Sequence, residues 1–342
     1  MRCWIPVCER RGRPDNMSLL SVDHLSIGYQ TKKGMLKAVD NICFDLEKGQ
    51  SLGFVGESGC GKTTIGMALM GLLPENAVIL DGHIRFQGND LASLTETQWQ
   101  TVRGAKIAMI FQAAMNALNP VMPVNEQIKE AIITHQPDIS KTDLADRMKQ
   151  LFDLVDIPAR RMTDYPHEYS GGMKQRAIIA MALACDPALI IADEPTTALD
   201  VIVQDQILKE IKKVQEQTRT GLVFISHDIA VVASVCERIC VMYAGQIVET
   251  GTRKEVFKSP RHPYTRTLLN SYLSLDNLND IRVPEMKESP DQTIDTDECR
   301  FAGSCAYASG CAGRSPDWID ISPTHKAFCC NPDVIRRGHG KS

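Results

Sequence analysis

The chain has 342 residues, of which 43% are hydrophobic; this suffices for about two domains with a sizeable core and excludes global disorder. Its formal net charge of −4 argues against a generic nucleic-acid-binding protein, which would carry a basic field. No apolar run approaches the ~18 residues of a membrane span.

Residues 1–17 lack the continuous apolar stretch of a secretory signal. We expect them to form a disordered leader, and the sequence leaves open whether translation starts at Met1 or at Met17. Without an export signal we expect a reducing environment, in which the 12 cysteines do not form disulfides.

The first ordered segment is expected to be β-structure. Residues 20–27 and 38–46 alternate apolar and polar side chains, the pattern of half-buried strands. Tyr29 is expected at the end of the first strand, before a polar turn. Its ring either fills the rim of the sheet or stacks on an adenine base.

Residues 56–63 read Gly-Glu-Ser-Gly-Cys-Gly-Lys-Thr and fit the phosphate-binding pattern G-x-x-x-x-G-K-[ST] at every fixed position. An apolar run at 51–55 predicts a buried strand before the loop, and residues 64–70 predict a helix after it. Loop N–H groups and the helix N-terminus favour an anion there. Lys62 is placed to reach the β- and γ-phosphates of a nucleotide, and Thr63 to hold Mg²⁺.

Residues 79–164 combine strands with helices. Strands are expected at 84–86 and 107–111, with a helix at 96–102 between them. Gln112 follows the second strand, where its amide can reach Mg²⁺ or an attacking water. Helical periodicity at 126–134 and 142–155 predicts a small helical subdomain.

A second anion site is predicted where Ser170, Gly171 and Gly172 begin a helix that continues to residue 184. A serine cap, free N–H groups and the positive end of the helix dipole favour a phosphate. The alternative is an ordinary helix cap.

Two further buried strands end in polar residues. Residues 188–192 are apolar and deliver Asp193 and Glu194, and residues 221–226 deliver His227. Open α/β sheets bind ligands at the carboxyl ends of their strands, so we expect an α/β fold with its site at that edge. Asp193 is placed to reach Mg²⁺, Glu194 to polarise a water, and His227 to bond the γ-phosphate. Asp200 begins the next helix.

Residues 18–258 resemble an ATP-binding cassette (ABC) protein, the ATPase subunit of an ABC transporter. The resemblance implies an ABC ATPase fold: a mixed core sheet, an N-terminal antiparallel β-subdomain, and a helical subdomain at about 113–169 that leads into the family signature. It implies an adenine-stacking Tyr29, a Mg²⁺ site of Thr63, Gln112 and Asp193, and catalytic roles for Lys62, Gln112, Glu194 and His227. The remaining ATP-binding positions that it implies are Gly56, Glu57, Ser58, Gly59, Cys60, Gly61, Thr64, Ser170, Gly171, Gly172, Gln175 and Asp200. In the signature, Tyr169 replaces the usual leucine and Met173 the usual glutamine.

Such cassettes dimerise head to tail, so Ser170 and Gly172 would serve the nucleotide of the partner. The resemblance implies a peripheral protein on the cytoplasmic face of the membrane. Its partners would be a second, identical or similar ATPase, two transmembrane permeases and an extracytoplasmic solute-binding protein, without nucleic acid.

Residues 259–342 are predicted to form a C-terminal extension. The stretch His262-Pro263-Tyr264-Thr265 resembles the extension of oligopeptide/dipeptide transporter ATPases, which implies peptide cargo, with nickel or another small solute as the alternative. A short helix is expected from Thr267, and a polar linker at 285–298. Cys299, Cys305, Cys311 and Cys329 match the cysteine series that this subfamily associates with a [4Fe–4S] cluster. Zn²⁺, free thiols and Cys330 in place of Cys329 stay open.

Non-transport ABC ATPases are the alternative from another class. DNA-repair and chromosome proteins separate their motifs by long coiled coils, whereas Gln112 and Ser170 are close in sequence. Translation factors carry two cassettes in one chain, and only one phosphate loop is found here.

Overall fold

The computed structural model describes residues 18–111, 117–197, 200–273, 298–311 and 313–337. The chain divides into two compact units. The first contains residues 1–46, 52–92 and 225–342, and the second contains residues 47–51 and 93–224. Each unit is described separately below.

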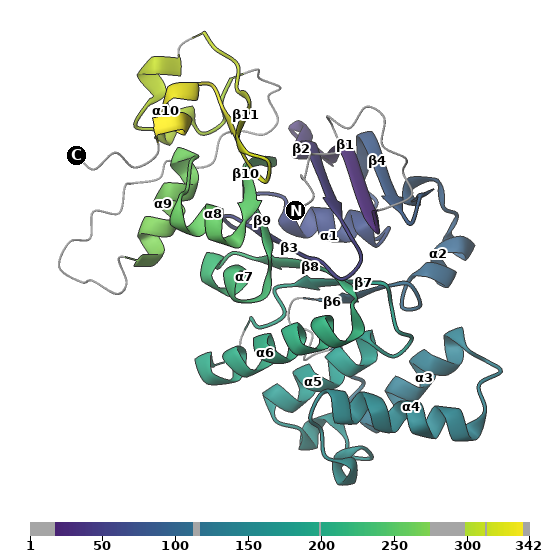
Figure 1. The fold of residues 1–342 in the computed structure, drawn as a ribbon. Helices are drawn as coiled ribbons and strands as arrows, with labels where there is room; N and C mark the ends of the chain where they lie inside the picture. The colour runs from purple at the N-terminus through teal and green to yellow at the C-terminus, as the bar shows by residue number, and fades with distance from the viewer. Residues whose placement is uncertain (1–17, 112–116, 198–199, 274–297, 312, 338–342) are drawn as a thin grey trace. The chain divides into compact units, whose positions relative to one another are not determined.

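The first unit contains an antiparallel sheet in the order β2-β1-β4-β5. Figure 1 shows β2, β1 and β4 side by side. Its strands are β1 (Leu20–Thr31), β2 (Gly34–Leu46), β4 (Ala77–Phe86) and β5 (Asn89–Asp90). The alternating residues predicted as strands lie in β1 and β2, but β1 continues to Thr31. Tyr29 therefore lies inside this strand, paired with Leu36 and Ala77, and not at its end as predicted.

The same unit contains strands in the order β11-β12-β10-β9-β3. They are β3 (Ser51–Val55), β9 (Arg238–Tyr243), β10 (Gln246–Thr252), β11 (Asp317–Ser322) and β12 (His325–Cys329). β3 pairs with β9 in parallel, while β9–β10, β10–β12 and β12–β11 are antiparallel, so this sheet is mixed. The helices of the unit are α1 (Lys62–Leu69), α7 (Ile229–Val235), α8 (Arg253–Lys258), α9 (Pro263–Leu273) and α10 (Pro332–Arg337).

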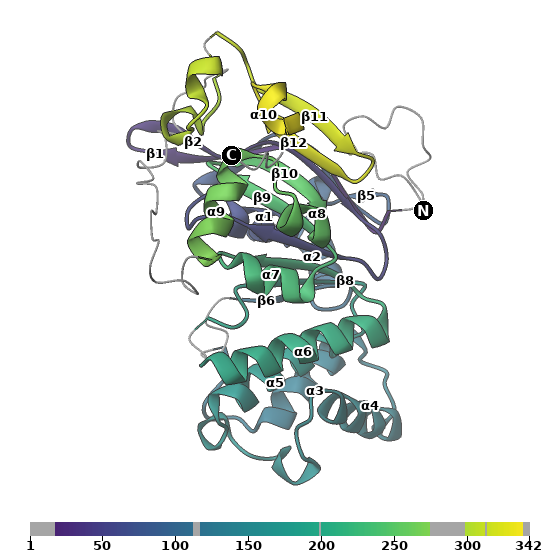
Figure 2. The same cartoon turned by 60° about the vertical axis from the view of Figure 1, so that its left-hand side comes forward.

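The second unit contains β6 (Ile107–Ile110) and β7 (Leu189–Asp193), which pair in parallel. β8 (Gly221–Ser226) follows α6 and crosses the boundary between the units near its end. All residues of β7 and β8 are buried, as expected for parallel strands covered on both faces. The helices are α2 (Glu96–Val102), α3 (Val124–His135), α4 (Lys141–Leu154), α5 (Gly171–Ala182) and α6 (Val201–Thr218), and α3, α4 and α5 lie together (Figure 2).

Hydrophobic periodicity located most of these helices. The helix predicted at 96–102 is α2, and those predicted at 126–134 and 142–155 are α3 and α4 with ends shifted by one or two residues. α9 begins at Pro263, earlier than the predicted Thr267, because proline suits the first turn of a helix.

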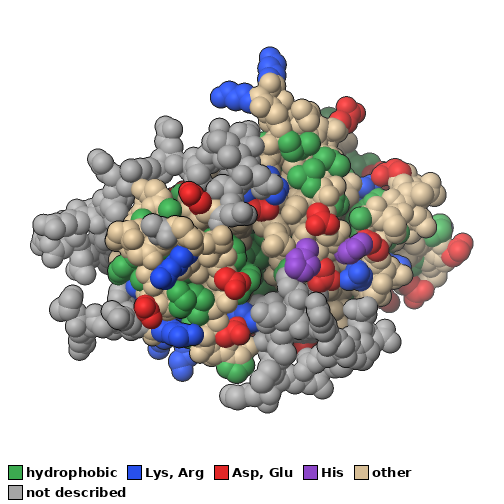
Figure 3. Space-filling model, turned by 90° about the horizontal axis from the view of Figure 1, so that it is seen from above, with side chains coloured by type: hydrophobic (Ala, Val, Ile, Leu, Met, Phe, Trp, Pro, Cys, Tyr) green, Lys and Arg blue, Asp and Glu red, His purple; other side chains and the backbone are tan. Residues whose placement is uncertain are grey.

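No described helix is long and apolar enough to cross a membrane. Acidic and basic side chains are interspersed over the described part of the face drawn in Figure 3. Of the described cysteines nine are free thiols, but Cys43 is disulfide-bonded, so the prediction that no cysteine forms a disulfide is wrong there.

Candidate functional site

The glycine-rich loop connects β3 to α1, which is the strand–loop–helix context that its sequence predicts. Gly61 precedes the first turn of α1 with φ 104°. A Cβ at this position would lie 2.3 Å from the carbonyl oxygen of Ala38. Both the left-handed backbone and the close approach require glycine, so the loop is packed tightly beneath the start of the helix.

Lys62 begins α1, and its side chain bonds back to the backbone of the loop. The side chain is 5% exposed, and its Nζ donates to the carbonyl oxygens of Gly56 and Glu57, both at 2.7 Å. Burial raises the pKa of Glu57 and of Cys60, and the nearby Lys62 ammonium opposes both shifts. The loop therefore holds a buried cation against backbone oxygens that an anion could replace.

Two other predicted residues lie in the same unit as the loop. The hydroxyl of Tyr29 lies 3.1 Å from the Oγ1 of Thr64 in α1. His227 is exposed and follows β8 directly. The next residue, Asp228, caps α7 by accepting from the N–H groups of Ala230 and Val231. The contact of Tyr29 with Thr64 places this aromatic residue beside the helix that follows the loop.

Asp193 and Glu194 lie in the second unit. Asp193 is the last residue of β7 and is 2% exposed. Glu194 leaves the strand with φ 46°, a left-handed conformation that is uncommon for glutamate, and its Oε2 accepts from the hydroxyl of Thr197 at 3.0 Å. Strained backbone of this kind clusters at functional sites, where it aims a side chain.

The predicted signature residues also lie in the second unit, at the start of α5. Ser170 caps the helix by accepting from the N–H of Met173, and Ser170 and Gly171 are exposed. Gln175 is 2% exposed, and its Nε2 finds no hydrogen-bond partner among the described residues. Asp200 caps α6 by accepting from the N–H groups of Ile202 and Val203. Gln112 lies outside the described residues.

Five cysteines of the C-terminal extension line one cavity. They are Cys299, Cys305, Cys311, Cys329 and Cys330. Burial raises the pKa of all five thiols, that of Cys311 to about 11. In the described ranges no three His, Cys, Asp or Glu side chains have the geometry of a metal-ion site. The cavity thus gathers sulfur donors without the compact arrangement that one ion requires.

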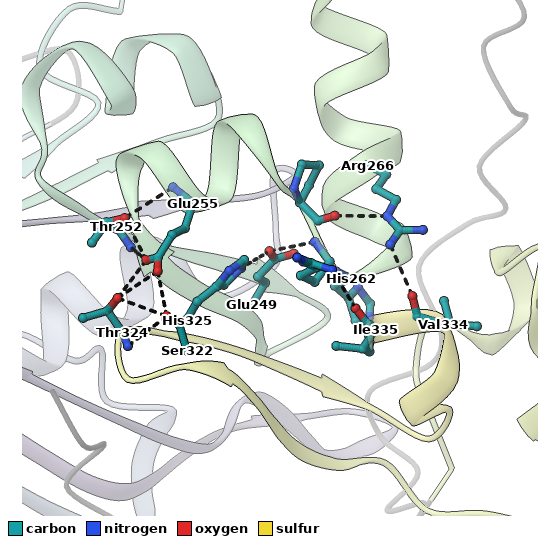
Figure 4. A network of polar contacts seen from close by, with 12 residues as sticks. Glu249, Thr252, Glu255, His262, Arg266, Ser322, Thr324, His325, Val334 and Ile335 are labelled. Carbon is teal, nitrogen blue, oxygen red and sulfur yellow. Dashed lines mark hydrogen bonds and ion pairs between the residues drawn. The ribbon is translucent and has the colours of Figure 1, made fainter. Parts of the chain in front are cut away.

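Two contacts made by the extension are not predicted by any sequence pattern. The N–H of Glu57 donates to the hydroxyl of Tyr264 at 3.1 Å, across 207 positions. Glu249 accepts from His325 and from the backbone N–H groups of Arg261 and His262 (Figure 4). The stretch 262–265 carries the subfamily resemblance, but its sequence does not say what Tyr264 contacts.

Comparison with known proteins gives two family matches. Residues 39–197 match the family described as ABC transporter, and residues 248–311 match the oligopeptide/dipeptide transporter C-terminal region. The second match includes Tyr264 and three of the five cysteines of the cavity.

Curated proteins resemble the chain over most of its length. A dipeptide transport ATP-binding protein, DppD of Lactococcus lactis, is 44% identical over 90% of this chain and 89% of its own. An oligopeptide transport ATP-binding protein, OppD of Bacillus subtilis, is 44% identical over 92% of this chain and 90% of its own.

Solved structures share the fold. The dimeric structure of MJ0796, a bacterial ABC transporter cassette, has a TM-score of 0.61 at 25% identity and covers 68% of this chain and 98% of that one. The cbiO1 structure from Clostridium perfringens has a TM-score of 0.63 and covers 76% of this chain and 97% of that one.

Proposed function

The chain belongs to the ABC transporter family as an ATP-binding subunit of the oligopeptide/dipeptide type, and from this premise we propose how its residues power the uptake of di- or oligopeptides. It hydrolyses ATP to ADP and phosphate for transport. The buried Lys62 in its glycine-rich loop is the observation that carries the proposal, because a cation held by exchangeable carbonyl oxygens is ready for a polyphosphate.

The loop residues Gly56 to Thr64 bind the phosphates, and Tyr29 stacks on the adenine. Lys62 neutralises charge on the β- and γ-phosphates. Thr63, Gln112 and Asp193 offer the oxygen ligands that Mg²⁺ prefers, and the ion would neutralise charge on the phosphate oxygens. Glu194 orients and polarises the attacking water, and His227 bonds the γ-phosphate.

Two copies of the cassette type form the complete site. Ser170, Gly171, Gly172 and Gln175 of one subunit meet the nucleotide bound by the other, and Asp200 lies at that junction. The exposed start of α5, with its serine cap and free N–H groups, supports this role. The exposed side chains of Val201 and Ile202 beside Asp200 support a contact with another subunit there.

The partners are a second similar ATPase, two transmembrane permeases and an extracytoplasmic solute-binding protein. The protein is peripheral on the cytoplasmic face of the membrane, through the permeases. Closure of the dimer on ATP and its opening after hydrolysis switch the permeases between two states.

The cysteine cavity is proposed to hold a [4Fe–4S] cluster through Cys299, Cys305, Cys311 and Cys329. Thiolates are the ligands of such clusters. Four thiolates around one cavity supply the ligand count of a cluster or of a zinc ion, and the resemblance to the peptide-transporter subfamily favours the cluster. Its role is structural: it ties together an extension whose described hydrophobic core is small.

The proposal is tested by rebuilding the whole transporter in lipid nanodiscs and measuring ATP hydrolysis with dipeptides, longer peptides and Ni²⁺. We expect peptides to stimulate hydrolysis through the solute-binding protein, and the Glu194→Gln complex to bind peptide without hydrolysing ATP. Stimulation by Ni²⁺ alone would show that the transported solute is a metal ion and not a peptide. Recovery of the chain with ribosomes or nucleic acid instead of permeases would refute the transport function.

A further inference from the structure

The backbone of the phosphate loop is bonded by other elements of the first unit. The carbonyl of Cys60 accepts from the N–H of Gly245, in the turn between β9 and β10, at 3.0 Å. The N–H of Glu57 donates to the hydroxyl of Tyr264 in α9 at 3.1 Å. The first is a backbone contact, whereas the second depends on one side chain from the C-terminal extension.

Tyr264 and Lys62 bind opposite sides of one peptide group. The carbonyl of Gly56, which accepts from Lys62 Nζ at 2.7 Å, and the N–H of Glu57 belong to the same planar peptide. In a trans peptide these two groups point in opposite directions. The tyrosine hydroxyl therefore fixes the orientation of the peptide that receives the lysine. Gly56 alone offers little resistance to rotation of that peptide, because glycine has a wide choice of backbone angles.

The ring of Tyr264 is fixed in turn. Tyr264 is 0% exposed, and its ring centroid lies 4.7 Å from that of Tyr243 and 5.6 Å from that of Phe301. Burial raises the pKa of Tyr264, so its hydroxyl stays neutral at physiological pH. Phe301 lines the cysteine cavity and follows Cys299 by two residues.

Arg300 attaches the cysteine-bearing segment to the turn between β9 and β10 and to β2. The Arg300 guanidinium donates to the carbonyl of Ala244 and to the carboxylate of Asp40, the latter at 2.7 Å. Ala244 precedes Gly245, whose N–H holds Cys60. The segment at 299–301 thus contacts both elements that hold the phosphate loop. Phe301 packs against Tyr264, and Arg300 bonds to the turn that contains Gly245.

We propose that Tyr264 is a positioning residue for nucleotide binding: it fixes the Gly56–Glu57 peptide, and the cysteine-bearing segment supports its ring through Phe301. The inference rests on the proposed function, since it assigns to the extension a part in building the ATP site. Lys62 exchanges the carbonyls for phosphate oxygens when ATP binds, while the Tyr264 bond keeps the loop in its binding conformation.

The test compares Tyr264→Phe with Tyr243→Phe in the full-length chain. Each variant loses one hydroxyl from the same aromatic cluster, but the hydroxyl that accepts from the N–H of Glu57 is that of Tyr264 and not that of Tyr243. Affinity for Mg²⁺ and a ribose-labelled fluorescent ATP is titrated, amide exchange is followed across residues 56–63, and thermal melting is recorded without nucleotide.

We expect Tyr264→Phe to weaken nucleotide binding about threefold to tenfold and to speed exchange at Glu57, with little change in melting temperature. Tyr243→Phe should stay within about twofold of wild type in both readouts. Phe301→Leu, which withdraws ring support but keeps the hydroxyl, should weaken binding less than Tyr264→Phe. It also tests the proposal if Tyr264→Phe does not fold.

Equal nucleotide affinity of Tyr264→Phe and wild type would overturn the inference, and so would equal weakening by Tyr243→Phe. If only Phe301→Leu folds, its binding with wild-type affinity would overturn the inference. If wild type itself does not bind the labelled ATP, the proposed function fails instead.

Discussion

Glu249 and His325 form a 2.7 Å hydrogen bond between side chains that are 0% and 2% exposed. Glu249 lies in β10 and His325 begins β12, so the bond joins the edge of the cassette sheet to the C-terminal hairpin. The other oxygen of the carboxylate accepts from the N–H of His262 at 2.8 Å. The extension is therefore attached through a buried polar network, not by apolar packing alone (Figure 4).

Glu249→Ala is expected to destabilise the protein by about 3–5 kcal/mol, because it leaves the buried His325 and the backbone N–H groups of Arg261 and His262 without their acceptor. The measurement is the free energy of unfolding from urea denaturation. Glu216→Ala, at an exposed position of α6, serves as the control and should change it by less than about 0.5 kcal/mol. A loss below about 1 kcal/mol for Glu249→Ala would show that water replaces the carboxylate at little cost.

Glu255 gives the stability of the extension a dependence on pH. Burial raises the pKa of this carboxyl, but hydrogen bonds from Ser322, Thr252 and Thr324 outweigh it, so the net pKa is lowered from 4.5. Between the folded and unfolded pKa values the unfolded state binds more protons, so stability rises with pH across that window. The contribution is present above pH 4.5 and is lost as the pH falls below it.

Glu255→Gln should therefore have a lower melting temperature than wild type at pH 7. The loss of stability should be at most about 1 kcal/mol, because water screens this partly exposed carboxylate, and it should shrink below pH 4.5. Melting temperatures at pH 7 and at mildly acidic pH check this, with the exposed Glu130→Gln as control. A difference that is the same at both pH values would mean that the carboxylate charge contributes nothing.

Local sequence patterns predicted the phosphate loop with its strand and helix, because glycines, apolar runs and a lysine at fixed spacing specify that conformation. They did not predict the hairpin of β11 and β12. Ile319 and Ile321 alternate with polar residues before Pro323, but such a short alternating stretch does not by itself specify which strand it pairs with. The bond of Glu57 to Tyr264 could not be predicted at all, since contacts between distant residues depend on how the whole sheet folds.

Lys62 and Glu194 should separate binding from hydrolysis. Lys62→Ala removes the buried cation and is expected to abolish detectable ATP binding. Glu194→Gln keeps the shape but not the base, so ATP should bind with near wild-type affinity while hydrolysis in the assembled transporter falls at least about 100-fold. Labelled-ATP titration and phosphate release measure the two effects, with the exposed Lys33→Ala as control. Hydrolysis within tenfold of wild type in Glu194→Gln would exclude this residue as the base.

The proposed [4Fe–4S] cluster predicts a metal content that can be measured. After anaerobic purification the wild-type chain should contain iron and acid-labile sulfide at about four each, and Cys305→Ser should lose most of both. Cys185→Ser is the control, because Cys185 is a free thiol that does not line the cavity.

The ligand choice between adjacent cysteines follows from the same experiment: Cys329→Ser should lose the cluster and Cys330→Ser should keep it. Since the pKa of the Cys311 thiol is raised to about 11, loading at neutral pH must displace a proton from it and should become tighter as the pH rises. One zinc per chain without sulfide would show that the cavity holds a structural zinc ion and not a cluster. A metal-free chain would leave five protonated thiols around the cavity, and the extension would then depend on the Glu249 network and its small apolar core alone.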